Sequence, residues 1–439
     1  MRLLAFACLS VIVAGCGTST LRPAGGQASS FAANSATSAT PTSAVTASSA
    51  RASATVPGAA ATGASTSAAA TRNGEPGTGS DATCGGPRTG SLGQGTLTGV
   101  EFVSATQGWA VGQNTILATT DGGAHWTAQL SGRLDLTSVD FISGQDGWAV
   151  GSTSLLATTD GGAHWLTLPE PCPVIRSVHF VSPSTGFAVA GGQNVGGVDP
   201  EMPVLGGVVL ATSDGGRTWH AVKAPANAQT VCFSDPRHGW LGAAGLLYRT
   251  SDGGADWKVL TSMAGAVGSG YPAEMSVECA NDGSAWALRA GPGAAMSQEP
   301  HVGFHADQAG ATPIFAEQYF QTPGGKPVAQ SPGSYAGPFS AIDAASAAFI
   351  DWCSACGPGT APWDIATNSG STLTKKGNVG AITQPQAASF LSPEVGWVAG
   401  SDSVFPTSAK GTTRSQERIV ATTDGGRTWH VQYAGPWTS

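Results

Sequence analysis

A short motif recurs five times along this chain of 439 residues and constrains its fold more than any other feature. Its common form is Thr-x-Asp-Gly-Gly-x-x-Trp. The carboxylate can accept backbone N–H groups within its own turn, and the paired glycines allow positive φ. Each copy therefore predicts a tight hairpin turn with the tryptophan folded back over it. The aspartates and tryptophans of the five copies are Asp121 and Trp126, Asp160 and Trp165, Asp214 and Trp219, Asp252 and Trp257, and Asp424 and Trp429.

A second signature, Gly-aromatic followed by small or apolar residues, lies upstream of each motif and follows a short apolar run such as VEFVS. In three units the aromatic residue precedes the aspartate by 12 residues, and in the other two by 27. The longer units therefore carry hairpin insertions that lengthen this spacing equally, within 191–207 and 401–418. The five copies of this signature are 108–112, 147–151, 186–190, 239–243 and 396–400.

The 172 residues between Asp252 and Asp424 leave room for two further, eroded units. One has AWALR at 285–289 with a weak turn at Asp307, and the other has AFID at 348–351 with ATNSGSTL at 366–373. Seven units of about 48 residues, each with four strands, predict an all-β seven-bladed propeller over 84–439. Packing the sheets around an axis would bury the Gly-aromatic side chains between neighbouring sheets. A two-sheet sandwich is the competing architecture. In the first unit we expect strands at 100–104, 108–113, 115–120 and 125–130.

The recurrent turn resembles the Asp box of sialidase-type (BNR) repeats. The fuller pattern, with the apolar strand, GWAVG and ILATTDGG, is similar to the photosystem II stability/assembly factor family, a group of seven-bladed propellers. The resemblance covers about 98–433, is weakest in units five and six, and implies a propeller that binds protein subunits. A role in photosynthesis does not follow from it. For the five Asp-box aspartates we favour a structural role, with calcium binding as the alternative.

The N-terminus, MRLLAFACLSVIVAGCG, has one positive charge and an apolar run at 3–14, which is typical of a secretory signal. The small residues before Cys16 resemble a bacterial lipobox. The resemblance implies cleavage after 1–15 and lipidation of Cys16 by a diacylglycerol and an acyl chain such as palmitate; a plain signal peptide is the alternative. Residues 16–83 are almost all Ala, Ser, Thr, Gly and Pro, so we expect a disordered linker. The predicted location is extracytoplasmic, anchored to the cell membrane, or to the outer membrane in a diderm cell.

Six cysteines follow Cys16, an even number that suggests disulfides in an exported protein. Cys232 and Cys279 lie in the first strands of adjacent units and form the favoured pair. Cys84 with Cys172 is a weaker candidate. Cys353 and Cys356 resemble a thioredoxin motif without its βαβ context, so a local staple is the simpler interpretation. A single CxxC also disfavours a zinc site.

The formal net charge is −8, and residues 84–439 have 26 acidic and 16 basic side chains, which disfavours nucleic-acid binding. A sialidase would need three arginines on a carboxylate and a tyrosine nucleophile paired with a glutamate. Two of the ten arginines, Arg217 and Arg427, lie inside Asp boxes, and Arg249 immediately precedes another. The other arginines and the tyrosines that could serve are Arg88, Arg133, Arg176, Arg237, Arg289, Arg414, Arg418, Tyr248, Tyr271, Tyr319, Tyr335 and Tyr433.

The sequence therefore indicates a non-catalytic protein-binding or assembly scaffold at the cell envelope, with a sialidase-like or other glycan-active hydrolase as the alternative. No catalytic residue, metal site or cofactor is assigned. We expect a monomer whose partner is an envelope protein or glycan. Binding is expected on loops at one end of the ring, above all units five and six and the insertions at 191–207 and 401–418, because specificity generally resides in variable loops on a regular frame.

Overall fold

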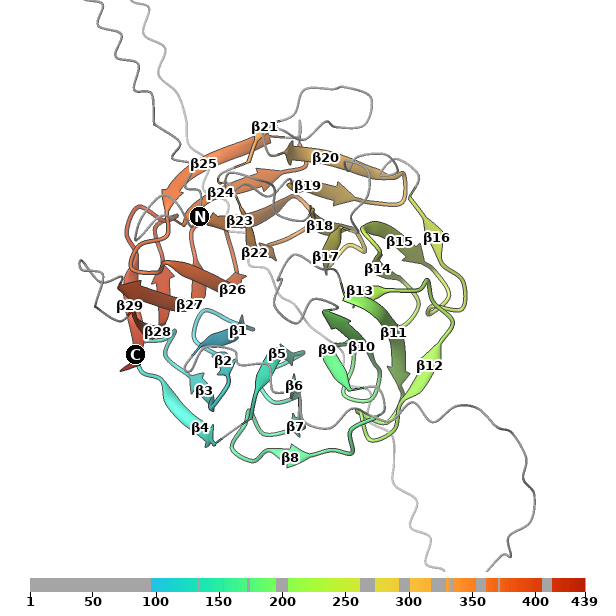
Figure 1. The fold of residues 1–439 in the computed structure, drawn as a ribbon, viewed down its shortest axis with the longest axis horizontal. Helices are drawn as coiled ribbons and strands as arrows, with labels where there is room; N and C mark the ends of the chain where they lie inside the picture. The colour runs from blue at the N-terminus through green and yellow to red at the C-terminus, as the bar shows by residue number, and fades with distance from the viewer. Residues whose placement is uncertain are drawn as a thin grey trace, which may run out of the picture. The chain divides into compact units, whose positions relative to one another are not determined.

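The computed structural model describes residues 96–438 apart from internal gaps. The predicted signal peptide, Cys16 and the linker lie outside the described residues. The described regular elements are strands, which form seven sheets around a common centre, antiparallel apart from one short strand pair (Figure 1). The gaps are 133, 153, 172–173, 195–203, 261–272, 292–300, 317–328, 332, 334, 353–360, 370–371 and 405–412.

The first four sheets, here called blades 1 to 4, each use four consecutive strands. In blade 1 the strands are β1 (Leu97–Phe102), β2 (Gly108–Gly112), β3 (Thr115–Thr119) and β4 (Thr127–Ser131). Blade 2 contains β5 (Leu136–Phe141), β6 (Gly147–Gly151), β7 (Leu155–Thr158) and β8 (Leu166–Thr167). Blade 3 contains β9 (Ile175–Phe180), β10 (Gly186–Asn194), β11 (Val204–Thr212) and β12 (His220–Val222). Blade 4 contains β13 (Ala228–Phe233), β14 (Gly239–Ala243), β15 (Leu246–Thr250) and β16 (Lys258–Val259).

Blades 5 and 6 are the eroded units of the sequence, and both form complete sheets. Blade 5 contains β17 (Glu274–Cys279), β18 (Ala285–Ala290), β19 (His301–Ala306), β20 (Ala311–Ala316) and a short fifth strand, β21 (Ala329–Gln330), parallel to β20. Blade 6 contains β22 (Tyr335–Ala341), β23 (Ser346–Trp352), β24 (Pro362–Thr367) and β25 (Thr372–Asn378). Blade 7 contains β26 (Gln384–Phe390), β27 (Gly396–Val404), β28 (Arg414–Thr422) and β29 (His430–Thr438). The seven-bladed propeller predicted from the repeats is confirmed.

Six of the seven blades contact the next through an aromatic side chain on their second strand, and blade 6 uses another strand. The indole of Trp109 on β2 stacks on Phe141 of blade 2, with ring centroids 3.5 Å apart and planes within 7°. Equivalent stacks join blades 2 to 3, 3 to 4 and 7 to 1. The predicted burial of the Gly-aromatic side chains between sheets is therefore confirmed, and it explains why a single blade is not a folding unit.

The glycine of the Gly-aromatic signature makes room for the phenylalanine of the first strand. A Cβ on Gly108 would lie 2.6 Å from ring atoms of Phe102, its partner across the β1–β2 ladder. In blades 5 and 6 the phenylalanine position holds a small residue instead, and the glycine position holds alanine: Cys279 pairs with Ala285 and Ala341 with Ala347. The eroded units thus exchange both members of the pair together.

Blade 6 also supplies its aromatic contact from a different strand. Ala348 occupies the second-strand position that is tryptophan in blade 1, and Trp363 on the neighbouring β24 faces blade 7 instead. Its ring lies 5.2 Å from that of Phe390. The packing between blades 6 and 7 is kept although the sequence signature is lost.

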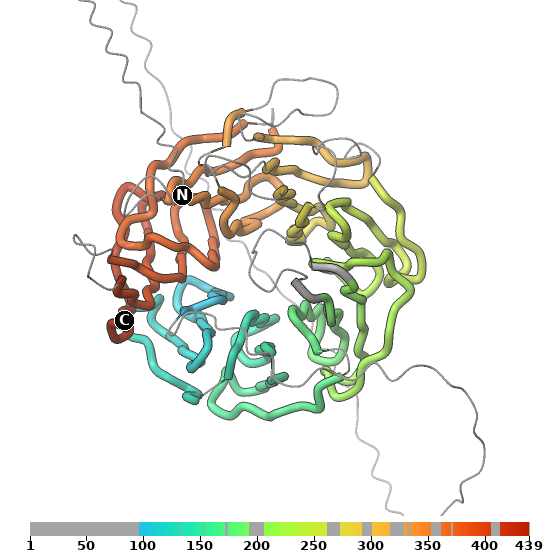
Figure 2. Tube along the Cα trace, viewed as in Figure 1, coloured from blue at the N-terminus to red at the C-terminus, as the bar shows by residue number. Residues whose placement is uncertain are grey.

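The ring closes through side chains, because blades 1 and 7 each consist of one contiguous segment (Figure 2). Trp397 of β27 stacks on Phe102 of β1 at 3.5 Å, and its Nε1 donates to the carbonyl oxygen of Gly122 at 3.2 Å. Gln432 on β29 donates to the same oxygen at 2.9 Å. Leu97 begins the first strand of blade 1.

Substitution of Trp397 should open the junction between blades 7 and 1. Because this side chain is 2% exposed, Trp397→Ala should lower the free energy of unfolding by about 3–5 kcal/mol in urea titrations. Trp437→Ala, which removes a tryptophan that is 38% exposed, is the matched control and should cost about 1 kcal/mol or less. Equal losses in the two variants would contradict closure through Trp397.

Candidate functional site

The two ends of the propeller differ in how strictly they repeat. At one end, here called the Asp-box face, the turn between the third and fourth strands contacts the turn between the first and second. In blade 1 the amide of Gly122 donates to the carbonyl oxygen of Thr106 at 2.9 Å, and blades 2, 3, 4 and 7 repeat this contact. Because the strands are antiparallel, the hairpins between second and third strands open at the opposite end, the hairpin face.

The aspartate of each Asp box is held within its own turn. In blade 1, Asp121 Oδ1 accepts hydrogen bonds from Thr119 Oγ1 and from the amide of His125, both at 2.9 Å. Gly122 and Gly123 have φ of 74° and 93°. The amide of His125 and its side chain hold the pKa of the Asp121 carboxyl at about 2. The same bonds from a threonine and a backbone amide recur at Asp160, Asp214, Asp252 and Asp424.

The Asp-box tryptophans pack edge-on against the phenylalanine of the first strand. The ring of Trp126 lies 5.8 Å from Phe102 with planes at 87°. Trp165, Trp219, Trp257 and Trp429 make the equivalent contact in their blades. These turns therefore serve the packing of the sheet.

The innermost strands carry a ring of blade-to-blade contacts that we call the axial ring. It uses one position per blade, the residue before the phenylalanine or its replacement. Phe141 N donates to Glu101 Oε2 at 2.8 Å, and Phe180 N donates to Asp140 Oδ2 at 2.7 Å. Its seven members are Glu101, Asp140, His179, Cys232, Glu278, Ser340 and Ser389.

Three further members of the axial ring bond to the blade that follows. Glu278 Oε2 accepts from Ala341 N at 2.7 Å. Ser340 Oγ accepts from Phe390 N and Ser389 Oγ accepts from Phe102 N, both at 3.0 Å. The short serine side chain and the long glutamate side chain thus both accept a hydrogen bond from the backbone amide at the same position of the next blade.

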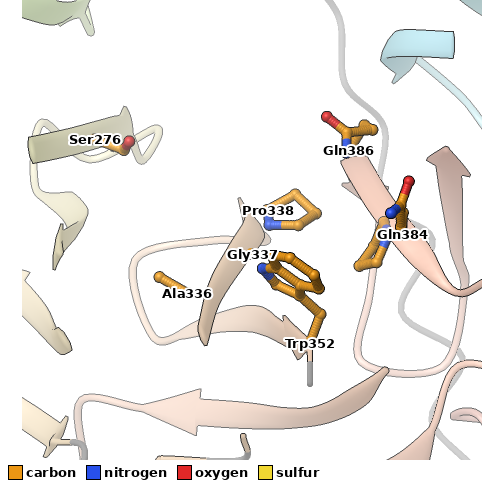
Figure 3. A pocket seen from close by; sticks show the side chains of 8 residues that line it. Ser276, Ala336, Gly337, Pro338, Trp352, Gln384 and Gln386 are labelled. Atoms are coloured by element: carbon orange, nitrogen blue, oxygen red, sulfur yellow. The ribbon is translucent and has the colours of Figure 1, made fainter. Parts of the chain in front are cut away.

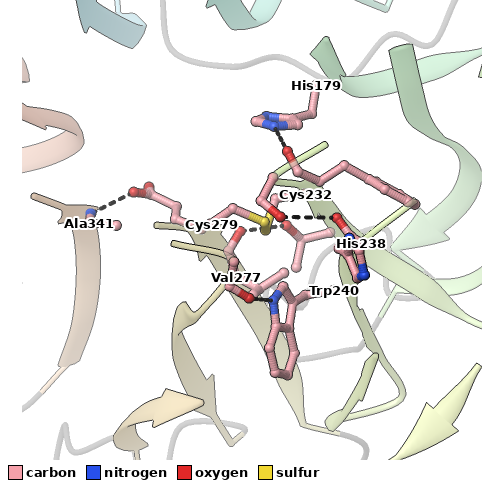
Figure 4. Close-up of a disulfide and its surroundings, with 12 residues drawn as sticks. His179, Cys232, His238, Trp240, Val277, Cys279 and Ala341 are labelled. Atoms are coloured by element: carbon pink, nitrogen blue, oxygen red, sulfur yellow. Dashed lines mark hydrogen bonds between the residues drawn. A yellow bond between two sulfur atoms is a disulfide. The ribbon is translucent and has the colours of Figure 1, made fainter. Parts of the chain in front are cut away.

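The last two junctions of the axial ring use different chemistry. His179 Nε2 donates to the carbonyl oxygen of Phe233 at 2.8 Å. A disulfide joins Cys232 to Cys279, with Cα atoms 5.6 Å apart, beside the indole of Trp240 (Figure 4). This is the favoured pairing of the sequence analysis. Cys84, Cys172, Cys353 and Cys356 lie outside the described residues.

Burial raises the pKa of the carboxyl groups in the axial ring. For Glu278 burial outweighs the hydrogen bond from Ala341 and raises the pKa to about 7. Burial and the nearby charge of Asp140 raise the pKa of Glu101 well above its usual range. Burial also raises the pKa of Asp140, while His179 opposes this effect. The innermost strands therefore carry acids that are costly to ionise.

The axial ring is not evident from the repeat pattern of the sequence. Its signal is the polar or cysteine residue before the phenylalanine in VEF, VDF, VHF, VCF and ASF. The chemical identity of this residue changes from unit to unit, so it does not appear as a repeat. What the seven residues share is their position in space.

Two hairpins extend the hairpin face in blades 3 and 7. The predicted insertions lengthen β10 and β11, and β27 and β28, to nine residues each. In blade 7, Arg418 Nη1 pairs with Asp402 Oδ2 at 2.9 Å. The guanidinium groups of Arg414 and Arg418 lie 5.2 and 5.9 Å from the ring centroid of Trp437. This hairpin is therefore a three-stranded extension with its own contacts.

Two arginines and one tyrosine that were considered for a sialidase site have other roles in the structure. Arg217 and Arg427 donate to carbonyl oxygens within their own Asp boxes. Tyr433 lies on β29, the outer strand of blade 7, where burial and the charge of Glu417 raise its pKa. A raised pKa is the opposite of what a tyrosine nucleophile needs. This tyrosine–glutamate pair also lies at the rim and not near the axis.

Within the described residues, His, Cys, Asp and Glu side chains do not gather in groups of three or more suited to a metal ion. In the same part of the chain, none of the secondary structure is a helix of the length and apolar content needed to cross a membrane.

The model of the family described as photosynthesis system II assembly factor YCF48 matches residues 92–228, which comprise blades 1 to 3. Over these blades the chain is similar to the photosystem II assembly factor family. The resemblance found in the sequence is thereby confirmed. No curated protein matches the chain.

Solved propellers resemble this one in fold alone. The GH74 xyloglucanase of Xanthomonas campestris is 14% identical with a TM-score of 0.38, over 77% of this chain and 45% of the enzyme, so this chain spans less than half of it. A structure of U3-55K is 9% identical with a TM-score of 0.47, over 70% of this chain and 88% of that one. An oligogalacturonate lyase is 9% identical with a TM-score of 0.49, covering 72% and 85% of the two chains.

Replacing Glu278 by glutamine should change how stability depends on pH. The carboxyl has a pKa of about 7 in the folded protein against 4.5 for the ordinary side chain, so its ionisation destabilises the fold as pH rises through this range. Glu278→Gln keeps an oxygen for Ala341 N and should raise the free energy of unfolding at pH 8 by up to about 3 kcal/mol, with little change at pH 4.

Urea titrations at pH 4, 6 and 8 would measure this effect. Glu394→Gln, at an exposed glutamate in a turn of the Asp-box face, is the control and should leave the pH profile unchanged. A Glu278→Gln protein that is less stable than the native one at pH 8 would show that the carboxylate stabilises the junction.

Proposed function

We propose that this protein is an extracytoplasmic, lipid-anchored propeller that acts as a non-catalytic scaffold for binding proteins of the cell envelope. The match to an assembly-factor family supports a binding role. The observation that carries the proposal is the difference between the two faces. The Asp-box face repeats the same hydrogen bonds in five blades, whereas the hairpin face carries the extended hairpins of blades 3 and 7.

A regular frame with irregular segments at one end is the usual arrangement of a binding protein, because the frame fixes the position of loops that differ in sequence. The frame here is fixed by stacked aromatic rings and by the axial ring. The partner is then recognised by the hairpin face. The acidic balance of residues 84–439 favours a protein or neutral glycan over a nucleic acid.

The anchor and linker give this scaffold its place in the cell. Lipid chains on Cys16 would hold the N-terminus at the membrane, since two or three chains anchor a protein stably. A flexible segment of the length of 16–83 has a root-mean-square reach of about 45 Å. The propeller could then reach partners at some distance from the lipid surface.

Cys16→Ser should release the protein from the membrane. The native protein should fractionate with membranes and incorporate labelled palmitate, whereas the variant should lose the label and appear in the soluble extracytoplasmic fraction. Cys8→Ser, within the cleaved segment, is the matched control and should behave as the native protein. Label retained in the Cys16→Ser protein would contradict the anchor.

Shortening the two hairpins tests the binding face. In the variant, 191–207 and 401–418 are replaced by the short turn of blade 1, and envelope proteins captured by the lipidated variant are compared with those captured by the native protein. We expect the captured partner to fall at least tenfold, because both hairpins would be removed while the blades keep their aromatic contacts.

The control for this experiment changes the opposite face. Arg217→Ala with Arg427→Ala removes two exposed side chains of the Asp-box face and should leave capture unchanged. Equal capture by the shortened protein, or turnover of a fluorogenic sialoside by the native one, would contradict the scaffold. The second result would support the hydrolase alternative.

A further inference from the structure

A pocket of about 470 Å³ lies on the hairpin face between the innermost strands of blades 5, 6 and 7. This volume is within the range of about 300–1,000 Å³ that is typical of small-molecule sites. Its walls come from β17, β22 and β26 and from the last residue of β23 (Figure 3). The lining residues are Ser276, Ala336, Gly337, Pro338, Trp352, Gln384, Pro385 and Gln386.

The indole of Trp352 provides the aromatic surface of the pocket, and it packs against a neighbouring aromatic ring. The ring of Trp352 lies 4.9 Å from that of Tyr335, with planes at 35°, and the indole remains partly exposed. The neighbouring Asp351 is 1% exposed and accepts hydrogen bonds from His301 Nε2 at 3.0 Å and from Gly333 N at 2.7 Å. The strand that presents Trp352 is therefore fixed before a ligand arrives.

The polar groups around Trp352 are neutral and have both donors and acceptors. Gln386 and Ser276 are exposed, and their side chains have no hydrogen-bond partner within the described part of the chain. The amide oxygen of Gln384 accepts from Ser401 Oγ at 3.3 Å, which leaves its N–H groups to donate. The eight lining residues carry no ionisable side chain, so the pocket is poorly suited to phosphate, sialic acid or a cation.

The two prolines restrict what can bind along the strand edges. β22 and β26 are edge strands of their sheets, the position at which an added peptide strand would pair. Pro338 and Pro385 lie on these edges within the pocket and have no N–H to donate. A ligand in the pocket is therefore expected to bind through the indole face of Trp352 and the side-chain amides of Gln384 and Gln386, and not by pairing with the strand edges.

We infer that this pocket binds a neutral saccharide. The apolar C–H face of a sugar ring can pack on Trp352, and sugar hydroxyls, which both donate and accept, match the amides of Gln384 and Gln386 and the hydroxyl of Ser276. The inference goes beyond the scaffold function and does not rest on it, because saccharide binding is a property of the isolated protein.

Isothermal titration of the detergent-solubilised full chain tests the site with cellotetraose, chitotetraose, mannotetraose and maltotetraose. At least one should bind with a Kd of about 1 mM or lower. Trp352→Ala should weaken that binding about tenfold, Trp352→Phe much less, and Gln386→Ala severalfold. Trp437→Ala, a tryptophan on the rim of blade 7, is the matched control and should bind as the native protein does.

Circular dichroism establishes that each variant is folded, and Gln386→Ala tests the site at an exposed side chain if Trp352→Ala does not fold. Failure of all four tetrasaccharides to bind would overturn the inference. An unchanged Kd in folded Trp352→Ala, or in Gln386→Ala where Trp352→Ala does not fold, would also overturn it. So would binding confined to 3′-sialyllactose or to a proline-rich peptide. Failure of the native protein to capture any envelope protein, with saccharide binding intact, would count against the scaffold alone.

Discussion

The contact between each blade and the next is the constraint on which the rest of this structure depends. A four-stranded sheet leaves the indole or phenyl ring of its second strand exposed until another sheet covers it, as Phe141 covers Trp109. Such contacts join six blades to the next, blade 6 uses Trp363 of its third strand, and the series returns to the start when Trp397 meets Phe102. The described strands of blade 1 and blade 7 are not exchanged, so among these residues the ring is closed by side-chain packing and hydrogen bonds.

The axial ring adds a polar contact to each of these junctions. A buried backbone N–H needs an acceptor, and any side chain of sufficient reach at the right position can supply one. Serine, aspartate and glutamate do so here, while the junction between blades 4 and 5 is joined covalently instead. The charged members make the fold sensitive to pH, because ionising a buried carboxyl such as that of Glu278 opposes folding.

The two faces of the propeller differ in how far their residues are needed for packing, and this difference explains where binding can evolve without loss of the fold. The Asp-box turns and the inner junctions are committed to packing. The hairpin face is not, and it contains both the long hairpins of blades 3 and 7 and the pocket between blades 5 and 7. The pocket lies where the units depart most from the repeat: Trp352 and Pro338 have no counterpart in blade 1.

The sequence by itself determined the number of units, the Asp-box turns and the Gly-aromatic strands, because each depends on residues close together in the chain and repeated with them. It also indicated the Cys232–Cys279 pair, because the two cysteines lie in the first strands of adjacent units. Only the tertiary structure decided how the ring closes, that Trp363 replaces the aromatic missing at Ala348, and that seven residues of five types form one axial ring. The pocket at Trp352 was equally hidden, since its walls come from β17, β22, β23 and β26 and meet only when three blades stand around one axis.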